Sequence, residues 1–445
     1  MADTDVARIE SRRPLLWLGV ALVIGVIVRL LWLNSVDTQP VTDFDWYFER
    51  ATEIANGMGY QVDGKPTAYW PVGYPAFLGL YFKVFGPSVI LGKVLNTILT
   101  LAAIPLTFLI ARRLFVAPAI AGVASLIVAV HPSFVAYSGI LASEPLYTSL
   151  TLGGTLAALH LRHNLKWVFI AGVLFGLAVL VRPQAVLIPG LVILCAWLND
   201  DTATRGFPLV RATWTLYALL ILTISPWLIR CFITFGAPVF VSTNGGDNIL
   251  IGNHEGASGR YKNPDSCGLV RDPNLGELER ERLARQAGLA YIKQHPLRTL
   301  RLWPKKLEYT FVTSSDVAYW SFQTEKGKLV TPGMGDDKAL YLGTKNASEV
   351  ATYLLLGMMG AALLLAPIWT RRGRGFIANP ITGWVLIGYT GLLSVAFFGN
   401  PRFAFGVLPF VAMYAASLPV GLLSLLLKLS PATIESEATT ESQSL

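Results

Sequence analysis

The chain has 445 residues, of which 53% are hydrophobic and only 14% are charged, and its mean hydropathy is +0.51. Since a soluble protein carries about 25% charged residues, this composition excludes an ordinary soluble domain and favours a membrane protein. The net charge of +8 comes from Lys and Arg residues scattered at the ends of apolar segments. That distribution is typical of cytoplasmic loops and differs from the clustered basic face of a nucleic-acid-binding protein.

The first apolar segment follows a basic flank that contains Arg8, Arg12 and Arg13. A signal peptide also begins with a basic flank, but this apolar run is too long for one and no small-residue cleavage site follows it. We therefore interpret it as a retained first transmembrane helix.

Ten apolar segments approach the length of about 20 residues that a bilayer-spanning helix needs. They cover residues 14–34, 87–110, 117–135, 144–161, 166–181, 184–198, 213–234, 350–369, 380–398 and 403–427. The predicted fold class is an all-α integral membrane protein with about ten transmembrane helices, juxtamembrane helices on the outer face and a small mixed outer subdomain.

The positive charges orient these segments, because cytoplasmic loops are enriched in Lys and Arg. With ten spans, the loops on the side of the N-terminal flank hold Arg112 and Arg113, Arg162 and Lys166, Arg205 and Arg211, and Arg371, Arg372 and Arg374. Both ends of the chain are then cytoplasmic.

This orientation predicts four parts. Residues 1–234 form an N-terminal transmembrane catalytic module, 235–349 an extracytoplasmic subdomain, 350–428 the C-terminal transmembrane helices, and 429–445 a disordered cytoplasmic tail. Within the subdomain, residues 275–307 predict one amphipathic helix that lies along the membrane surface.

The first outer loop begins with TDFDWYFERATEIANGMGY, which places Asp43 and Asp45 two residues apart. A carboxylate there can act as a general base, bind a divalent cation, or cap the helix that begins near Trp46. Capping accounts for one aspartate and not for both.

Aromatic residues and prolines follow in the same loop, in the sequence PTAYWPVGYP. Tyr69, Trp70 and Tyr74 carry rings that favour the boundary between lipid and water. They either anchor the loop to the membrane surface or form the wall of a pocket that opens toward both lipid and water.

Glu144, in LASEPLY, is a second acid expected on the outer face. It either stabilises the start of a helix, where negative charge is favourable, or joins the first outer loop at a site. Arg182, in LVRPQ, is an arginine between apolar runs, and an ionisable residue at membrane depth indicates a functional site by default.

Arg402, in NPRF, and Arg230, in WLIRCF, are further isolated cations on the outer side. Arginines among few other charges suit a phosphate group, because a guanidinium matches its oxygens in pairs. The alternative for each is an arginine whose head reaches the membrane surface. The sequence contains no P-loop, dinucleotide fingerprint or zinc motif.

The order TDFDWY, PTAYWPVGYPAFL, SEPLY, VRPQ, PWLIR and NPRF resembles that of polytopic glycosyltransferases with the C-type membrane fold. This group includes protein mannosyltransferases, the aminoarabinose transferases of lipid A and the Rhizobium galacturonosyltransferases. The resemblance covers the chain from its first helix to its last. It implies a polyprenyl-phosphate sugar as donor and an active site that faces outward.

The resemblance also implies residue roles. An aspartate four residues before a tyrosine, matched by Asp43 and Tyr47, would be the general base that activates the acceptor hydroxyl. Asp45 has no counterpart, so its role stays open as a helix cap or an acceptor contact. Glu144 matches a second acid near the donor phosphate or a metal, which allows a divalent metal held by Asp43 and Glu144.

One motif departs from the aminoarabinose transferases, which carry a Glu-Lys pair where this chain has Tyr69 and Trp70. The phosphate-binding lysine is therefore missing, and Arg182, Arg402 or Lys93 would replace it. Tyr47, Tyr69, Trp70 and Tyr74 would support the acceptor.

The resulting prediction is an inverting sugar transfer to a hydroxyl of a lipid, glycan or protein acceptor. It would occur at the periplasmic face of a bacterial inner membrane. The alternatives are a polymerase or ligase of lipid-linked glycans and a lipid flippase or transporter. A transporter would place charges at the bilayer midplane, whereas these acids and arginines are expected at one surface, which favours the enzyme.

Overall fold

A computed structural model of the chain describes residues 2–161, 164–198, 209–263, 266–267, 275–323, 335–371 and 381–426. These residues form helices, short turns and one small hairpin.

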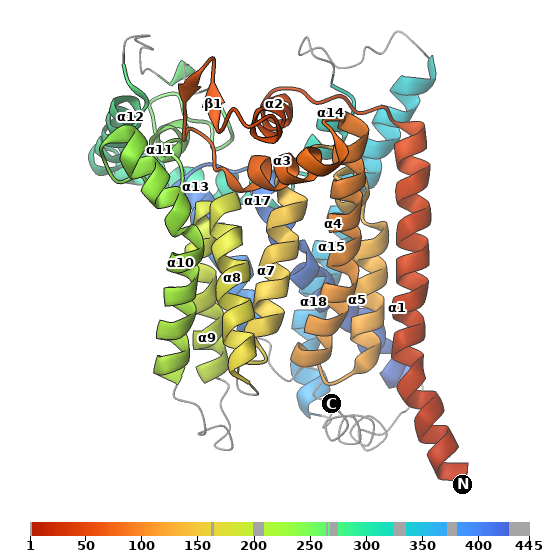
Figure 1. Ribbon diagram of the computed structural model, residues 1–445. Coiled ribbons are helices and arrows are strands. Elements are labelled where there is room, and N and C mark those ends of the chain that lie inside the picture. The colour runs from red at the N-terminus through yellow and green to blue at the C-terminus, as the bar shows by residue number, and fades with distance from the viewer. Residues whose placement is uncertain are drawn as a thin grey trace.

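The long helices stand side by side as a bundle (Figure 1). They are α1 (Ala2–Ser35), α4 (Val89–Leu114), α5 (Pro118–Val130), α7 (Glu144–Ala158), α8 (Leu165–Val181), α9 (Ile188–Leu198), α10 (Leu209–Phe235), α15 (Gly335–Arg371), α16 (Ile381–Ala396) and α18 (Leu408–Leu426). Each contains most of one predicted apolar segment, so the all-α fold class is confirmed.

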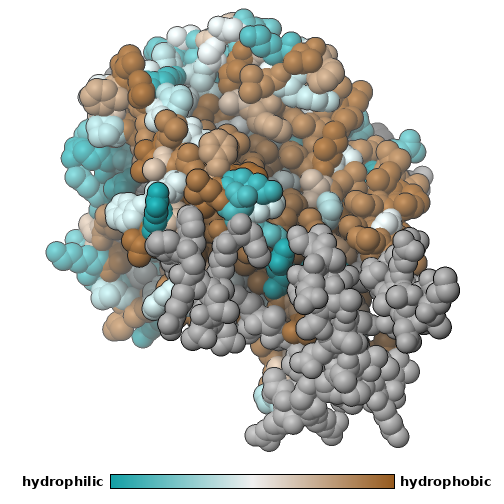
Figure 2. Space-filling model, turned by 60° about the horizontal axis from the view of Figure 1, so that its bottom comes forward, coloured by the Kyte–Doolittle hydropathy of each residue, from teal (hydrophilic) through white to brown (hydrophobic). Residues whose placement is uncertain are grey.

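Five of these helices are long and apolar enough to cross a membrane, and four shorter apolar helices of 10–17 residues accompany them. Much of the face drawn in Figure 2 is brown, as expected for side chains that face lipid. The chain is therefore a multi-pass membrane protein, while the exact number of crossings stays a prediction.

Short elements gather at one end of the bundle, above the long helices in Figure 1. They include α2 (Asp43–Ala55), β1 (Gln61–Val62), β2 (Lys65–Pro66), α3 (Gly73–Phe85), α11 (Gly245–Gly252), α12 (Glu277–Gln294), α13 (Pro296–Phe311), α14 (Asp316–Ser321) and α17 (Pro401–Ala404). Turns of helix at α6 (Pro132–Ala136), η1 (Pro183–Leu187) and η4 (Phe405–Val407) complete the described elements. The predicted juxtamembrane helices are thus present.

The opposite end of the bundle carries basic residues. Arg112 and Arg113 lie in the last turn of α4, and Lys166 lies at the start of α8. The predicted Arg162, Arg205, Arg372 and Arg374 and the tail 429–445 lie outside the described residues. The orientation of the chain therefore stays a prediction.

One detail of the predicted subdomain is wrong. Residues 275–307 form two helices, because α12 ends at Gln294 and α13 begins at Pro296. Proline has no N–H and disfavours a helical residue before it. The described part of 235–349 consists of helices, turns and an isolated bridge at Arg260, while the β1–β2 pair lies in the first outer loop.

Two glycines allow the outer elements to approach the bundle closely. A Cβ atom on Gly73, at the start of α3, would lie 2.5 Å from the carbonyl carbon of Leu180 near the end of α8. A Cβ atom on Gly252, at the end of α11, would collide with the carbonyl oxygen of Phe397 just after α16. Both contacts lie beside segments that carry candidate site residues.

Candidate active site

Asp43 is the first residue of α2, and the residue before it has an unusual backbone. Thr42 has φ +53°, and its Oγ1 donates a hydrogen bond of 3.0 Å to Oδ1 of Asp43. The helix begins at Asp43 and has no side-chain cap, so the predicted capping role of Asp43 or Asp45 is wrong. Both aspartates lie in the first turn instead, where negative charge is favourable. The side chain of Asp45 is exposed.

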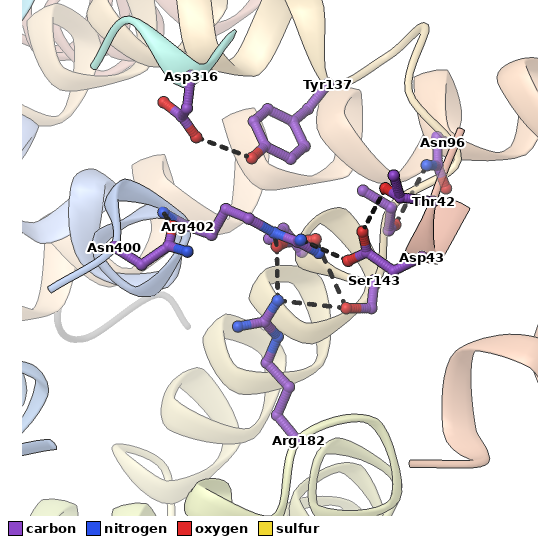
Figure 3. A network of polar contacts seen from close by, with 11 residues as sticks. Thr42, Asp43, Asn96, Tyr137, Ser143, Arg182, Asp316, Asn400 and Arg402 are labelled. Carbon is purple, nitrogen blue, oxygen red and sulfur yellow. Dashed lines mark hydrogen bonds and ion pairs between the residues drawn. The ribbon is translucent and has the colours of Figure 1, made fainter. Parts of the chain in front are cut away.

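Four charged residues form a connected chain, which we call the inner ion chain: Asp43, Arg402, Glu144 and Arg182. Arg402 donates from Nη1 to Oδ2 of Asp43 and from Nε to Oε1 of Glu144. Arg182 donates from Nη2 to the same oxygen of Glu144 at 2.5 Å and to Oγ of Ser143 at 3.3 Å. Figure 3 shows Asp43 and Arg182 on two sides of Arg402.

Each member of the inner ion chain stands at the end of a helix. Arg402 lies in α17, whose start is capped by Asn400, because Oδ1 of Asn400 accepts the backbone N–H of Arg402 at 3.0 Å. Glu144 opens α7 ahead of a proline, and Arg182 follows the last residue of α8 with an extended backbone. The helix ends therefore converge at the end of the bundle where the short elements gather.

The inner ion chain is largely buried: the side chain of Glu144 is 1% exposed, that of Arg402 12%, that of Arg182 13% and that of Asp43 18%. Buried charges are costly unless they are paired, and here two carboxylates balance two guanidinium groups. One buried donor is left over, because Nε of Arg182 has no hydrogen-bond partner among the described residues. The guanidinium of Arg402 also lies 5.0 Å from the centre of the Phe44 ring.

A third acid lies beside this chain. Asp316, in α14, accepts a hydrogen bond of 3.5 Å from the hydroxyl of Tyr137, and Figure 3 shows both residues next to Arg402. Burial, opposed by the nearby Arg402, raises the pKa of Asp316 to about 7. Asp316 is therefore mostly protonated below neutral pH.

A polar pocket of about 580 Å³ opens beside Asp43. Three of the predicted supporting residues, Tyr47, Tyr69 and Trp70, line it together with Arg182. Burial and the neighbouring Asp43 raise the pKa of Tyr47 to about 12, so its hydroxyl stays protonated.

Tyr74 lies behind this pocket and does not line it. It is 1% exposed and donates a hydrogen bond of 3.1 Å to Oδ1 of Asn96 in α4. Its ring packs edge-on against that of Tyr47 at 5.3 Å. Tyr74 therefore supports the pocket wall from the core.

A second pocket of about 450 Å³ is mostly apolar and is walled by residues of α7, α9, α16 and α18. The two pockets share Arg182, Pro183, Gln184, Asn244, Asn248 and Phe403. Arg182 is the one charged side chain that lines both pockets among the described residues. An apolar cavity thus meets a polar one at a guanidinium group.

Two predicted cations lie elsewhere. Lys93 forms an ion pair with Asp37 at 3.1 Å, and neither pocket is lined by it. Arg230 donates to the backbone carbonyls of Thr67 and Tyr60, both at 2.8 Å, and so attaches the first outer loop to α10. These two bonds give Arg230 a structural role, so phosphate binding is not needed to explain why it is there.

The contacts at Asp43 and Glu144 do not fit a metal ion, because Arg402 lies between the two carboxylates. Within the described part of the chain, no three His, Cys, Asp or Glu side chains are grouped so that they could hold a metal. A divalent metal at this site stays a prediction.

The sequence reasoning did not identify Asp247, which lines the polar pocket. It lies in α11 and accepts hydrogen bonds from Tyr69 at 2.7 Å and from Arg280 of α12 at 3.1 Å. The surrounding STNGGDNIL is rich in glycine and asparagine. An acid directly after two glycines was the available signal, but its partners lie far away in the sequence.

Comparisons with known proteins add to this geometry. Residues 70–229 match the family model described as dolichyl-phosphate-mannose-protein mannosyltransferase. A search of curated proteins found no match. Among solved structures, the chain is similar to an apo oligosaccharyltransferase of Archaeoglobus fulgidus, at 17% identity and a TM-score of 0.52 over 97% of this chain and 54% of that one. The predicted resemblance to the C-type glycosyltransferases is confirmed.

Two further structures were found. The oligosaccharyltransferase AglB of Archaeoglobus fulgidus, in complex with an inhibitory peptide and a dolichol-phosphate, has 16% identity and a TM-score of 0.51, over 97% of this chain and 54% of that one. ArnT of Cupriavidus metallidurans bound to undecaprenyl phosphate has 15% identity and a TM-score of 0.42, over 91% of this chain and 78% of that one. The chain spans about half the length of the oligosaccharyltransferases that it matches, and it has their fold over that part.

Proposed function

We propose that the protein is a glycosyltransferase that moves a sugar from a polyprenyl-phosphate donor to a hydroxyl group of a lipid, glycan or protein acceptor. The observation that carries this proposal is the position of Arg182, which lines both the apolar pocket and the pocket that holds Asp43. A lipid phosphate has an apolar chain and an anionic head. The apolar pocket suits the chain, and Arg182, where the two pockets meet, suits the head. One matched structure contains a dolichol-phosphate.

The donor phosphate would bind at Arg182 and Arg402. Nε of Arg182 has no hydrogen-bond partner in the described part of the chain, so it can donate to a phosphate oxygen without breaking a bond seen there. Charge-assisted bonds from guanidinium to phosphate are among the stronger hydrogen bonds in proteins. Lys93 stays a less supported candidate for the same role.

The reaction follows from this placement. The acceptor oxygen forms a bond to the anomeric carbon of the sugar, while the bond from that carbon to the phosphate oxygen breaks. The electron pair leaves on the phosphate, whose charge the two arginines stabilise. The acceptor proton passes to the carboxylate of Asp43, and the single displacement inverts the anomeric centre.

The contact between Arg402 and Asp43 suggests an order of events. Oδ2 of Asp43 accepts a hydrogen bond from Arg402 in this structure. A donor phosphate would compete for the same guanidinium and draw it away from the carboxylate. Donor binding would then leave Oδ2 available for the acceptor proton, so the base becomes ready only when a donor is present.

The test is transfer of a radiolabelled sugar from purified polyprenyl-phosphate sugars by the full chain in nanodiscs. Loss of a general base lowers the rate by about 10²–10⁴-fold, so we expect such a decrease for Asp43→Asn. The matched control is Glu279→Gln, an exposed acid on α12, which should transfer at the wild-type rate. Full activity of Asp43→Asn would contradict the assignment of the base.

Two outcomes separate the alternatives. Transfer of an entire glycan chain in this assay would indicate a polymerase or ligase, and movement of the lipid across the membrane of sealed vesicles without transfer would indicate a flippase. Either result would replace the proposed reaction.

We place the reaction at the periplasmic face of a bacterial inner membrane. Lys65, in β2, and Arg113, at the end of α4, are exposed at opposite ends of the bundle. Single cysteines at these positions should be labelled by an impermeant reagent from opposite sides of sealed vesicles. Labelling of both from one side would contradict the topology.

A further inference from the structure

Residues of α11 form one wall of the polar pocket, and Asp247 in this wall is held by hydrogen bonds. Asp247 is 3% exposed and lines this pocket. Its Oδ2 accepts hydrogen bonds from the hydroxyl of Tyr69 at 2.7 Å and from Nη2 of Arg280 at 3.1 Å. These partners fix the carboxylate from two sides.

The other oxygen of this carboxylate is unsatisfied. Oδ1 of Asp247 is buried and accepts no hydrogen bond from the residues that the structure describes. Leaving a buried polar atom without a partner costs about 1–3 kcal/mol, and more for a charged group. A ligand in the pocket that donates a hydrogen bond to Oδ1 would recover this energy.

The charges indicate what kind of donor this is. Arg280 already neutralises Asp247, so the wall offers little net attraction to a cation. The carboxylate disfavours an anionic group such as a phosphate. A neutral donor remains, and the hydroxyl group of a sugar is one.

The rest of the pocket lining fits a polyhydroxyl ligand. The rings of Trp46, Trp70 and Trp320 line the pocket, and flat aromatic faces pack well against the C–H faces of a sugar ring. Asn248 and Asn244 add amide groups that can both donate and accept.

We infer that Asp247, Tyr69 and Asn248 form a sugar-binding subsite in which Oδ1 of Asp247 accepts a hydrogen bond from a sugar hydroxyl. The inference rests on the proposed function and deepens it, because it names a residue that selects the sugar. A site with a buried acceptor discriminates strongly against an analogue that lacks the matching hydroxyl.

A neighbouring acid holds this wall in place. Glu277, one turn before Arg280 on α12, accepts hydrogen bonds from the hydroxyls of Thr67 at 2.8 Å and Thr243 at 2.6 Å. It also accepts the backbone N–H of Ala68 at 2.9 Å. The start of α12 therefore ties the first outer loop to the segment before α11, and it keeps Tyr69 beside Asp247.

The first experiment measures binding of methyl glycosides of mannose, galactose and arabinose to the full chain in nanodiscs. Tryptophan fluorescence reports binding, because three tryptophans line the pocket. We expect at least one glycoside to bind saturably and Asp247→Asn to weaken it about tenfold or more, as for loss of a hydrogen bond to a charged group. The matched control Asp37→Asn, whose side chain is 82% exposed, should bind like the wild type.

A second measurement needs no variant and so does not depend on the folding of Asp247→Asn. The wild type is titrated with single-deoxy analogues of the glycoside that binds. We expect one analogue, which lacks the hydroxyl that reaches Asp247, to bind at least about tenfold more weakly. Equal binding of all the analogues, or no binding of any glycoside, overturns the inference.

The bound sugar can belong to the donor or to the acceptor, and lipid probes separate these sources. Binding of undecaprenyl-phosphate mannose is compared with that of bare undecaprenyl phosphate. If Asp247→Asn weakens the free glycosides and the glycosylated lipid but not the bare lipid, the subsite holds the donor sugar. If it weakens the free glycosides but neither lipid, the subsite holds the acceptor. Equal weakening of both lipids overturns the inference.

Failure of the proposed function gives a different result. A wild-type protein that binds glycosides through Asp247 but transfers no sugar from any donor contradicts the glycosyltransferase reaction and leaves the subsite standing. A protein that transfers sugar while Asp247→Asn binds glycosides normally contradicts the subsite alone.

Discussion

The inner ion chain and the ion pairs along α12 contain the same residue types in opposite settings. On α12, Glu279 pairs with Arg282 and Glu281 pairs with Arg285, three and four residues apart within one helix. The inner ion chain joins residues up to 359 positions apart and is almost wholly buried. Exposed pairs contribute little to stability, whereas a buried set costs desolvation. The proposed binding of a donor phosphate would account for a set of charges that carries this cost.

The largest expected effect comes from Glu144→Gln, which breaks the buried set at its centre. The substitution removes the negative charge that both Arg402 and Arg182 contact. Removing one partner of a buried pair costs about 3–5 kcal/mol, so we expect a marked decrease in the thermal unfolding temperature in detergent micelles, with loss of sugar transfer.

The matched control for this prediction is Glu279→Gln on α12. Its partner Arg282 is 55% exposed, and we expect no measurable change in unfolding temperature. Equal effects of the two substitutions would contradict the distinction between the buried and exposed sets.

The second prediction concerns Gly73→Ala, a substitution that should shift the inner ion chain without changing any charge. A Cβ atom in Gly73→Ala would lie 2.5 Å from the carbonyl carbon of Leu180, two residues before Arg182. The first outer loop and the end of α8 must then separate. Since misplacement by about 1 Å can lower a rate by about 10²-fold, we expect a decrease of that order in sugar transfer.

The control is Gly357→Ala in α15, where an added Cβ atom meets no neighbour within 4 Å. It should leave transfer unchanged and stabilise the helix slightly. Wild-type transfer by Gly73→Ala would show that this close approach does not position the site.

Periodicity and charge identified the helices of this chain, because both are local properties of the sequence. Ten apolar segments and the acidic first turn at Asp43 could be found in this way. The break at Pro296 was missed because the amphipathic pattern continues across it, although the proline itself was a visible signal. Local patterns fix elements more securely than the boundaries between them.

Pairing within the site could not be predicted in the same way. That Arg402 contacts both Asp43 and Glu144 depends on where three helix ends meet. The importance of Asp247 depends on Arg280 and Tyr69, which lie on two other segments. Sequence order carries no direct record of such contacts, so residue types were identified and their partners were not.

The third prediction concerns the pH dependence of stability and rests on Asp316, an acid that lies beside the inner ion chain. Its pKa is about 7 in the folded protein, against an ordinary value of 3.8. The folded state therefore keeps a proton that the unfolded state loses, so the free energy of unfolding falls as pH rises from about 4 to about 7. The slope is at most about 1.4 kcal/mol per pH unit for one proton.

Asp316→Asn removes this titration, and its unfolding temperature should vary less with pH over that range than that of the wild type. Asp37→Asn, at an exposed carboxylate, should keep the wild-type slope. Identical slopes for wild type and Asp316→Asn would show that the carboxyl group does not titrate there.

The smallest effect is expected for Lys93→Met, which asks whether the pair of Lys93 and Asp37 behaves like the exposed set or the buried one. The carboxylate of this pair is 82% exposed, so its loss should change the free energy of unfolding by less than about 1 kcal/mol. Because Lys93 lines neither pocket, we also expect sugar transfer and binding of undecaprenyl phosphate within about twofold of wild type, a difference of less than about 0.5 kcal/mol.

Arg182→Gln, measured beside Lys93→Met, should weaken lipid-phosphate binding at least about tenfold, because it removes a charged donor. If Lys93→Met weakened that binding as much as Arg182→Gln, Lys93 would take the place of the missing phosphate-binding lysine.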